Sequence, residues 1–236
     1  MTINYNPSIV TTNLLVCLDA GNPRSYSGSG TVWYDVSGNN NNFNIVAGAY
    51  NSSGPKYMDF NGSYGCAKNS SDISLSDSTG VTYFLVTRIK TAGDWRTLTR
   101  SYSSDHEVII YYNGYEIGMY DNDGVGFLGS GFYQTSLPNY GTSNWVAIYW
   151  RWQSSSPYYE LSYNDTPGVI RGSITNSNAR YNRGFGSLGG YHNGNSTPSD
   201  ASQYWGDIAY FAAYNTRLTD AQLLQNFNAM RGRFGI

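Results

Sequence analysis

Short runs in which apolar and polar residues alternate recur along most of the chain, with turn residues between them. The run from Asn144 to Trp152 is the clearest, because every second residue from Val146 onward is Val, Ile or Trp. A period of two is typical of β-strands, and regular short strands without intervening helices indicate an antiparallel sandwich or barrel. The predicted strands are Leu14–Asp19, Lys56–Phe60, Val81–Ile89, Trp95–Arg100, His106–Tyr112, Tyr115–Tyr120, Asn144–Trp152, Tyr158–Tyr163 and Tyr204–Tyr214.

The dipeptide Asn113-Gly114 separates two of these strands, His106–Tyr112 and Tyr115–Tyr120. Asn-Gly between alternating hydrophobic runs is the strongest short-range hairpin signal, since both residues tolerate positive φ. We therefore expect the two strands to pair as an antiparallel hairpin.

One helix is predicted at the end of the chain, at about 219–231. Thr219 is the expected N-cap, and Gln222 three residues later completes a capping box. Leu218 and Leu223 occupy the two positions of a hydrophobic staple. Gly232 is expected to end the helix. The apolar stripe that should dock the helix on the sandwich consists of Leu223, Leu224, Phe227 and Met230.

Charge is scarce in this chain. Only 13% of its 236 residues are charged and the net charge is −2, whereas about 25% are charged in an average soluble domain. No basic patch is visible, so nucleic acid is not an expected partner. No apolar run approaches the ~18–20 residues that cross a membrane, so no membrane partner is expected either.

The polar surface must instead come from neutral side chains, and the chain has 23 Tyr and 6 Trp. Such a surface suits contact with other proteins or with sugars, where charges would have to lose water. It is equally typical of a β-protein that uses Tyr and Thr on its strands. Both interpretations stay open.

The N-terminal segment and the cysteines bear on where the protein folds. Met1 to Thr12 is polar and carries no basic-then-apolar secretion signal, so we expect synthesis in the cytoplasm. Cys17 and Cys66 are too few for a disulfide framework, and Cys17 sits in an apolar strand as an expected buried thiol. We expect residues 1–12 to form an arm that orders only against a partner or its own sheet, and 13–236 to form a single domain.

Both ends of the chain carry specific motifs. The stretch from 14 to 23 reads LLVCLDAGNP, and Ser25-Tyr26, Trp33 and Asp35 follow it. The stretch 58–62 reads MDFNG, and the closing motifs are GDIA at 206–209, YN at 214–215, RLTD at 217–220 and RGRFG at 231–235. Together these motifs resemble laminin-G-like jelly-roll domains, of the concanavalin-A-like class, found in virion proteins of tailed bacteriophages.

This resemblance covers both ends and roughly a quarter of the chain, and the middle, about residues 90–200, carries none of its motifs. It implies an all-β, concanavalin-A-like (laminin-G-like) antiparallel jelly-roll sandwich with one short C-terminal helix. It also implies a phage particle made in a host cytoplasm as the setting. A fold by itself fixes no function.

Catalytic residues are not expected. Concanavalin-A-like glycoside hydrolases place paired carboxylates along one strand. The chain has three glutamates, and none has a second carboxylate at the required spacing; Asp105 with Glu107 is the nearest approach. The only histidines, His106 and His192, lack the context of a nucleophile elbow. We therefore expect a protein that is not an enzyme. The glutamates are Glu107, Glu116 and Glu160.

Two loops are rich in oxygen ligands. The sequence DNDG at 121–124 places oxygens at alternating positions, as calcium loops do, which makes Asp121 and Asp123 calcium candidates. It lacks the downstream Glu of an EF-hand, and Asp-Gly after Asn suits a tight turn, so a turn is the preferred interpretation. Asp35 with Asn39 and Asn41 should likewise make side-chain-to-backbone turn bonds. No metal and no cofactor are expected.

Sugar recognition is the third kind of site to consider. Sugars stack on exposed aromatic faces, and loops that vary on a fixed scaffold are where recognition usually lies. Some of these side chains can equally be core residues. The candidate glycan contacts, all in the middle of the chain, are Trp95, Tyr102, His106, Tyr111 and Tyr140.

The leading hypothesis from sequence is a non-enzymatic structural protein of a phage virion, present in many copies as a head decoration or as a fibre or tail component. It would dock on other virion proteins of the capsid or tail. The alternative hypothesis is a carbohydrate-binding module that recognises host surface glycan. A glycoside hydrolase ranks third because carboxylates are scarce.

Overall fold

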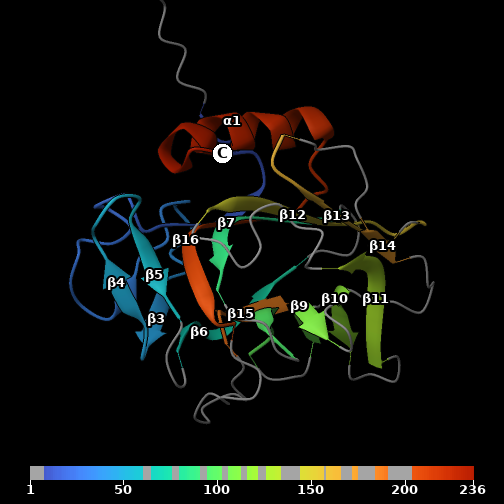
Figure 1. The fold of residues 1–236 in the computed structure, drawn as a ribbon, viewed down its shortest axis with the longest axis horizontal. Coiled ribbons are helices and arrows are strands. Elements are labelled where there is room, and N and C mark those ends of the chain that lie inside the picture. The colour runs from blue at the N-terminus through green and yellow to red at the C-terminus, as the bar shows by residue number, and fades with distance from the viewer. Residues whose placement is uncertain are drawn as a thin grey trace, which may run out of the picture.

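The alternating strands pair into two antiparallel sheets that stack face to face in the computed structural model, with one helix on the outer side of the first sheet (Figure 1). The structure describes residues 8–60, 65–75, 80–90, 95–102, 106–112, 116–121, 126–133, 144–156, 158–165, 172–174, 184–190 and 204–236. The antiparallel jelly-roll sandwich expected from the sequence is confirmed.

The first sheet has the strand order β14-β13-β12-β7-β16-β5-β4, and β1 also pairs with β16. Its strands are β1 (Leu14–Asp19), β4 (Ala49–Asn51), β5 (Tyr57–Asp59), β7 (Val81–Ile89), β12 (Val146–Trp152), β13 (Tyr159–Tyr163), β14 (Gly172–Ile174) and β16 (Gly206–Tyr214).

The second sheet has the strand order β11-β10-β9-β8-β15-β6-β3-β2. Its strands are β2 (Val32–Trp33), β3 (Phe43–Val46), β6 (Cys66–Ser74), β8 (Thr97–Arg100), β9 (His106–Tyr112), β10 (Glu116–Asp121), β11 (Gly126–Tyr133) and β15 (Gly184–Leu188). The predicted pairing of β9 with β10 is confirmed. The Asn113-Gly114 turn itself lies outside the described residues.

Seven of these strands were not predicted, and their composition explains why. β6 carries a mostly polar sequence, CAKNSSDIS, and β11 and β15 are rich in glycine. Only some residues of each meet the core: Ala67 and Ile73 of β6 are buried there, whereas Ser70 and Ser71 are exposed. The strands that sequence analysis missed are β2, β3, β4, β6, β11, β14 and β15.

The first sheet lies between two cores. Along β12, Val146, Ile148, Trp150 and Trp152 share one face, as predicted, and that face meets the second sheet, whereas Ala147 and Tyr149 face the helix. The strands β7 and β16 divide their side chains in the same way. A sheet that is buried on both faces has nearly continuous apolar strands, which is why these three gave the strongest strand signals in the sequence.

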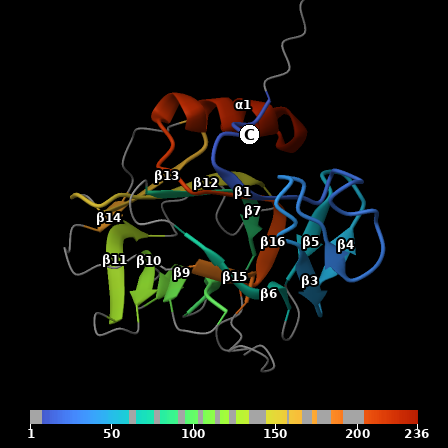
Figure 2. The ribbon, with the colours of Figure 1, turned by 180° about the vertical axis from the view of Figure 1, so that it is seen from behind.

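The helix α1 (Asp220–Phe234) covers the outer face of the first sheet (Figure 2). The predicted capping box is present: the Thr219 side chain accepts from the Gln222 amide, and the Gln222 side chain accepts from the Thr219 amide. Leu218 and Leu223 are both fully buried, as the staple requires. Among the described residues, no helix is long and apolar enough to span a membrane.

Two details of the helix prediction are wrong. The helix continues past Gly232 to Phe234 and is capped by Gly235, whose φ is 68°. The reason is tertiary, because Phe234 is buried with its ring 5.2 Å from that of Trp145. Leu224 does not belong to the buried stripe, since it is 40% exposed. The buried residues of the helix are Leu223, Asn226, Phe227 and Phe234.

Residues 8–12 pack against the helix and β16. The Val10 amide donates to Asn226 Oδ1 at 2.8 Å, and the Tyr214 hydroxyl donates to the Val10 carbonyl oxygen at 3.0 Å. Asn226 Nδ2 in turn donates to the Tyr214 hydroxyl at 3.0 Å. This closed network of buried polar groups holds one part of the predicted arm against the protein itself. Residues 1–7 lie outside the described residues, so the arm's role in docking stays a prediction.

Both cysteines are free and buried, as expected for Cys17. Burial raises the pKa of the Cys17 thiol to about 12 and that of Cys66 to about 11. Because the thiolate is the reactive form, both should be inert in the folded protein.

Candidate glycan-binding surface

The oxygen-rich loop around Asp35 is fully used in turn bonds, as predicted. Asp35 Oδ1 accepts from the amides of Cys17 and Ser37 at 2.9 and 2.8 Å, and Oδ2 accepts from the Asn41 amide at 3.0 Å. The side chains of Asn39 and Asn41 donate to the carbonyl oxygen of Leu15. The loop therefore supplies hydrogen-bond partners to the backbone of β1. Within the described part of the chain, no group of metal-ligating side chains is found.

The two glutamates whose side chains are described, Glu116 and Glu160, are held in structural contacts. Glu160 is buried and pairs with Arg151 and Arg217. Glu116 accepts from the Gly131 amide at 2.5 Å, and its carboxyl group lies where a Cβ at Gly129 would be. Asp105 lies outside the described residues, and of Glu107 only the backbone in β9 is described.

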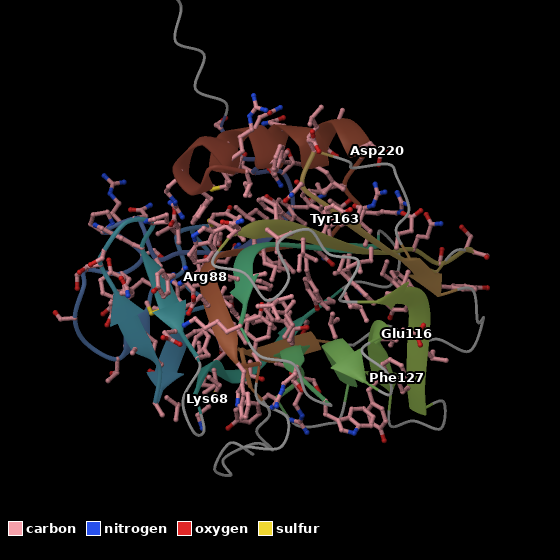
Figure 3. All side chains as sticks on the ribbon, in the orientation of Figure 1. Lys68, Arg88, Glu116, Phe127, Tyr163 and Asp220 are labelled. Atoms are coloured by element: carbon pink, nitrogen blue, oxygen red, sulfur yellow. The ribbon has the colours of Figure 1, made fainter. Side chains whose placement is uncertain are left out.

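A row of paired residues crosses the outer face of the second sheet. Met119 is in the core and Leu128 packs against it, so their neighbours Tyr120 and Phe127 face outward. Figure 3 places Phe127 on the side of this sheet away from the helix. From one end of the sheet to the other, the row registers Phe127, Tyr120, Glu107, Arg100, Ser187, Lys68 and Asn44.

This row is covered in the middle and open at the β10–β11 end. Arg100 and Ser187 are fully buried, and Arg100 Nη1 donates to the Ser101 carbonyl oxygen. Tyr120 and Phe127 are partly exposed. The accessible part of the outer face therefore begins at the two aromatic residues.

Trp95 joins these two residues in a group that we call the aromatic surface cluster, formed by Trp95, Tyr120 and Phe127. The ring of Trp95 lies 5.1 Å from that of Tyr120, at an interplanar angle of 89°, and 6.2 Å from that of Phe127, at 82°. Edge-to-face contacts of this kind are favourable aromatic geometries. All three rings are partly exposed, so the cluster presents an aromatic surface to solvent.

The backbone at Trp95 has an uncommon conformation. Its φ is 59°, and Trp205, at the start of β16, has φ 54°. Bulky residues rarely occupy this left-handed region, and strain of this kind is concentrated at ligand-binding and active sites. Among the described residues, four other non-glycine residues have positive φ, and three of them are Asn, which tolerates the conformation. The left-handed conformations of Trp95 and Trp205 therefore make the region around these two residues a candidate ligand-binding site.

The sequence-predicted glycan contacts have different outcomes. Trp95 is a surface residue and not a core residue. The Tyr102 amide donates to Asp72 Oδ1 at 2.5 Å, and a Cβ at Gly186 would lie 2.7 Å from Tyr102 Cβ, so Tyr102 lies over β15. Only the strand backbone is described for His106 and Tyr111 in β9 and for Asp121 in β10. Tyr140 and Asp123 lie outside the described residues.

Sequence analysis missed Tyr120, Phe127 and Trp205. Tyr120 was the last residue of a predicted strand. Because β11 was not predicted, the pairing of Tyr120 with Phe127 could not be predicted either. The signal available was an aromatic residue on each side of the DNDG turn, which a hairpin brings together on one face.

No family model matches the chain, and no curated protein matches it in sequence. Solved structures do match. A mutant of Trypanosoma rangeli sialidase with trans-sialidase activity matches 97% of this chain with a TM-score of 0.60 at 13% identity. The binding domain of Paraclostridial Mosquitocidal Protein 1 matches 92% with a TM-score of 0.64 at 13% identity. The receptor-binding domain of botulinum neurotoxin C/D mosaic serotype matches 92% with a TM-score of 0.61 at 11% identity.

These likenesses show the fold, an all-β jelly-roll-like sandwich shared by binding domains and by part of a larger enzyme. The chain spans about a third of the sialidase, 35%, and about half of the two toxin domains, 52% and 51%. The expectation that the protein is not an enzyme is corrected by this finding. Structures of sialidases match nearly the whole chain, so the lack of a paired-carboxylate strand does not exclude an enzymatic role for this fold.

Proposed function

We propose that this protein is a carbohydrate-binding module and that the aromatic surface cluster of Trp95, Tyr120 and Phe127 contacts the sugar. The observation that carries the proposal is the strained, partly exposed Trp95, held edge-on against two other partly exposed rings. A ring that is already fixed loses little conformational entropy when a ligand stacks on it, which favours binding.

The surroundings suit a neutral polar ligand. Only 13% of the residues are charged, so most polar side chains are neutral ones such as Asn, Ser, Thr and Tyr. A sugar ring has an apolar face for stacking and hydroxyl groups for hydrogen bonds, so it matches aromatic rings beside neutral donors and acceptors. The solved structures that the chain resembles include a receptor-binding domain and a sialidase in complex with sialic acid, which supports the choice of a glycan as ligand.

A glycan array probed with the wild-type protein and with variants tests this proposal. Trp95→Ala should weaken binding to the bound glycan at least about 10-fold, because buried aromatic anchors dominate such contacts. Tyr120→Ala should weaken it less. Tyr34→Ala is the matched control, since Tyr34 is also an exposed tyrosine, 49% accessible, but follows β2 at the far edge of the sheet. Equal binding by wild type, Trp95→Ala and Tyr34→Ala would refute the assignment.

For the setting we propose the surface of a virion, with the protein in many copies beside other capsid or tail proteins and with host glycan as the ligand. This part of the proposal rests on the sequence motifs at the two ends of the chain alone. A map of a purified particle that shows the sandwich at the particle surface, with the aromatic surface cluster turned outward, is the result expected. Burial of that cluster against a capsid protein would argue for docking in place of glycan binding.

A further inference from the structure

Trp205 forms a second aromatic position near the first. It precedes β16, and its carbonyl oxygen accepts from the Lys90 amide at 3.2 Å, just after β7 ends. The following residue has no room for a side chain, because a Cβ at Gly206 would lie 2.6 Å from the ring of Tyr204 and 2.7 Å from the carbonyl oxygen of Arg88. Position 206 therefore requires glycine, and the hydrogen bond from Lys90 ties the backbone of Trp205 to the end of β7.

Arg96 links the two tryptophans. Its guanidinium carbon lies 3.8 Å from the centroid of the Trp205 ring, and it directly follows Trp95 in the chain. Arg96 is 93% buried by its surroundings, with 7% exposed, so this cation–π contact is largely shielded from water. Shielded contacts of this type are stronger than exposed ones, and they hold both partners in place.

The two indoles belong to different sheets. Trp95 contacts β10 and β11 of the second sheet, whereas Trp205 directly precedes β16 of the first. An indole matches one sugar ring in size, so a single sugar residue stacks on one of them. Arg96 directly follows Trp95 in the chain and contacts the Trp205 ring, so one arginine side chain connects the two indole positions, a separation suited to a chain of sugars and not to a single sugar ring.

We infer that Trp95 and Trp205 are two stacking subsites of one site for an oligosaccharide chain, and that Arg96 is a positioning residue that orients the Trp205 indole. This inference rests on the proposed function and makes it more specific, since it names a linear oligosaccharide and not a terminal monosaccharide as the ligand class.

Isothermal titration with cello-, chito- and malto-oligosaccharides, from the monosaccharide to the hexasaccharide, tests the inference. For a series that binds, the affinity of the wild type should rise with chain length and then level off. Trp205→Ala should remove this rise, lowering the affinity for the longest ligand about 3- to 10-fold while leaving the shortest unchanged. Trp205→Phe should retain part of it.

Substitutions of Arg96 test its role as a positioning residue separately. Arg96→Gln should lower the affinity for the hexasaccharide toward that of Trp205→Ala, and the double variant should lose no more than Trp205→Ala alone, because the two residues act through one indole. Arg96→Lys should restore part of the loss, since it keeps the charge. If Arg96→Gln fails to fold, as a melt would reveal, the comparison of Trp205→Ala with Trp205→Phe decides the matter.

Failure of the inference and failure of the proposed function give different results. If Trp95→Ala weakens every ligand but Trp205→Ala changes none, or if affinity is independent of chain length, the site has one subsite and the inference is wrong. If a glycan binds but neither substitution affects its affinity, the assignment of the site to the aromatic surface cluster is wrong. If no oligosaccharide of any length and no glycan on the array binds, the glycan-binding function itself is wrong.

Discussion

Two aromatic clusters of similar make-up lie on opposite outer faces of the sandwich. The first, which we call the helix-covered cluster, consists of Phe84, Tyr149 and Tyr210 on the first sheet. Phe84 stacks on Tyr149 at 5.0 Å and contacts Tyr210 at 5.5 Å, and all three are at most 1% exposed. The aromatic surface cluster on the second sheet has similar ring spacings but stays partly exposed.

The two clusters differ in whether a helix covers them. The helix α1 lies over the first cluster, with Leu223 and Phe227 in the same core (Figure 1). The described residues place no helix over the second cluster. Aromatic packing therefore contributes to folding stability on the helix-covered face. On the other face, the aromatic rings stay accessible to a ligand. Substitutions should change mainly stability on the first face and mainly binding on the second.

The largest expected effect is alkaline unfolding driven by tyrosines of the two cores. Burial raises the pKa of Tyr83, Tyr149, Tyr210 and Tyr214 well above the usual range. A group whose pKa is raised on folding contributes stability that is fully present below its unfolded pKa, about 10, and is lost as pH rises. One pH unit above that value, each such group lowers the free energy of unfolding by about 1.4 kcal/mol, so four lower it by about 6 kcal/mol.

Urea unfolding measured between neutral pH and about pH 11 checks this, with tyrosinate absorbance as a second signal. Tyrosinate should appear in the buried population only together with unfolding. A free energy of unfolding that stays constant across this range would contradict the burial of these hydroxyl groups.

The next largest effect should come from Phe227→Ala. The side chain is 2% exposed beneath the helix, and removing a fully buried phenylalanine side chain costs about 3–5 kcal/mol. The control is Leu224→Ala on the same helix, which should change stability by less than about 0.5 kcal/mol because Leu224 lies on the exposed side. Equal losses in chemical denaturation would show that the helix is docked differently.

A smaller loss is expected for Asn226→Leu. The substitution keeps a similar volume but leaves the Val10 amide without its acceptor and removes a donor to Tyr214. A buried donor that loses its partner costs about 1–3 kcal/mol. Hydrogen exchange should also reveal faster exchange at the Val10 amide, and unchanged protection there would mean that residues 8–12 are held by other contacts.

The smallest effect on stability should come from Trp95→Gly. Glycine relieves the left-handed strain, worth about 1–2 kcal/mol, but loses the packing of the indole on Tyr120, so the two changes nearly cancel. The melting temperature should move by only a few degrees while glycan binding is lost. A large drop in melting temperature would make Trp95 a structural residue and would remove the contrast between the two clusters.

The sequence by itself determined the elements whose information is local or periodic. The boundaries of β1, β7 and β9 were predicted to the residue, since their bounding turns and apolar runs are clear. The Thr219–Gln222 capping box was predicted because it needs only residues that are close in the chain. Trp95 could be nominated as a glycan contact from residue type alone, but its exposure could not be predicted.

Only the tertiary structure decided which aromatic face is covered, how far the helix runs, and which residues accompany Trp95. Phe127 lies on a glycine-rich strand with little periodicity, so its contact with Trp95 depends on how the strands are ordered in the sheet. Trp205 is distant from Arg96 in sequence, so the contact between these two residues also forms only on folding. Asn226 reads as a surface residue, yet it is fully buried because Val10 and Tyr214 complete its hydrogen bonds. Such contacts arise from residues that meet only after folding, and periodicity along the chain contains no information about them.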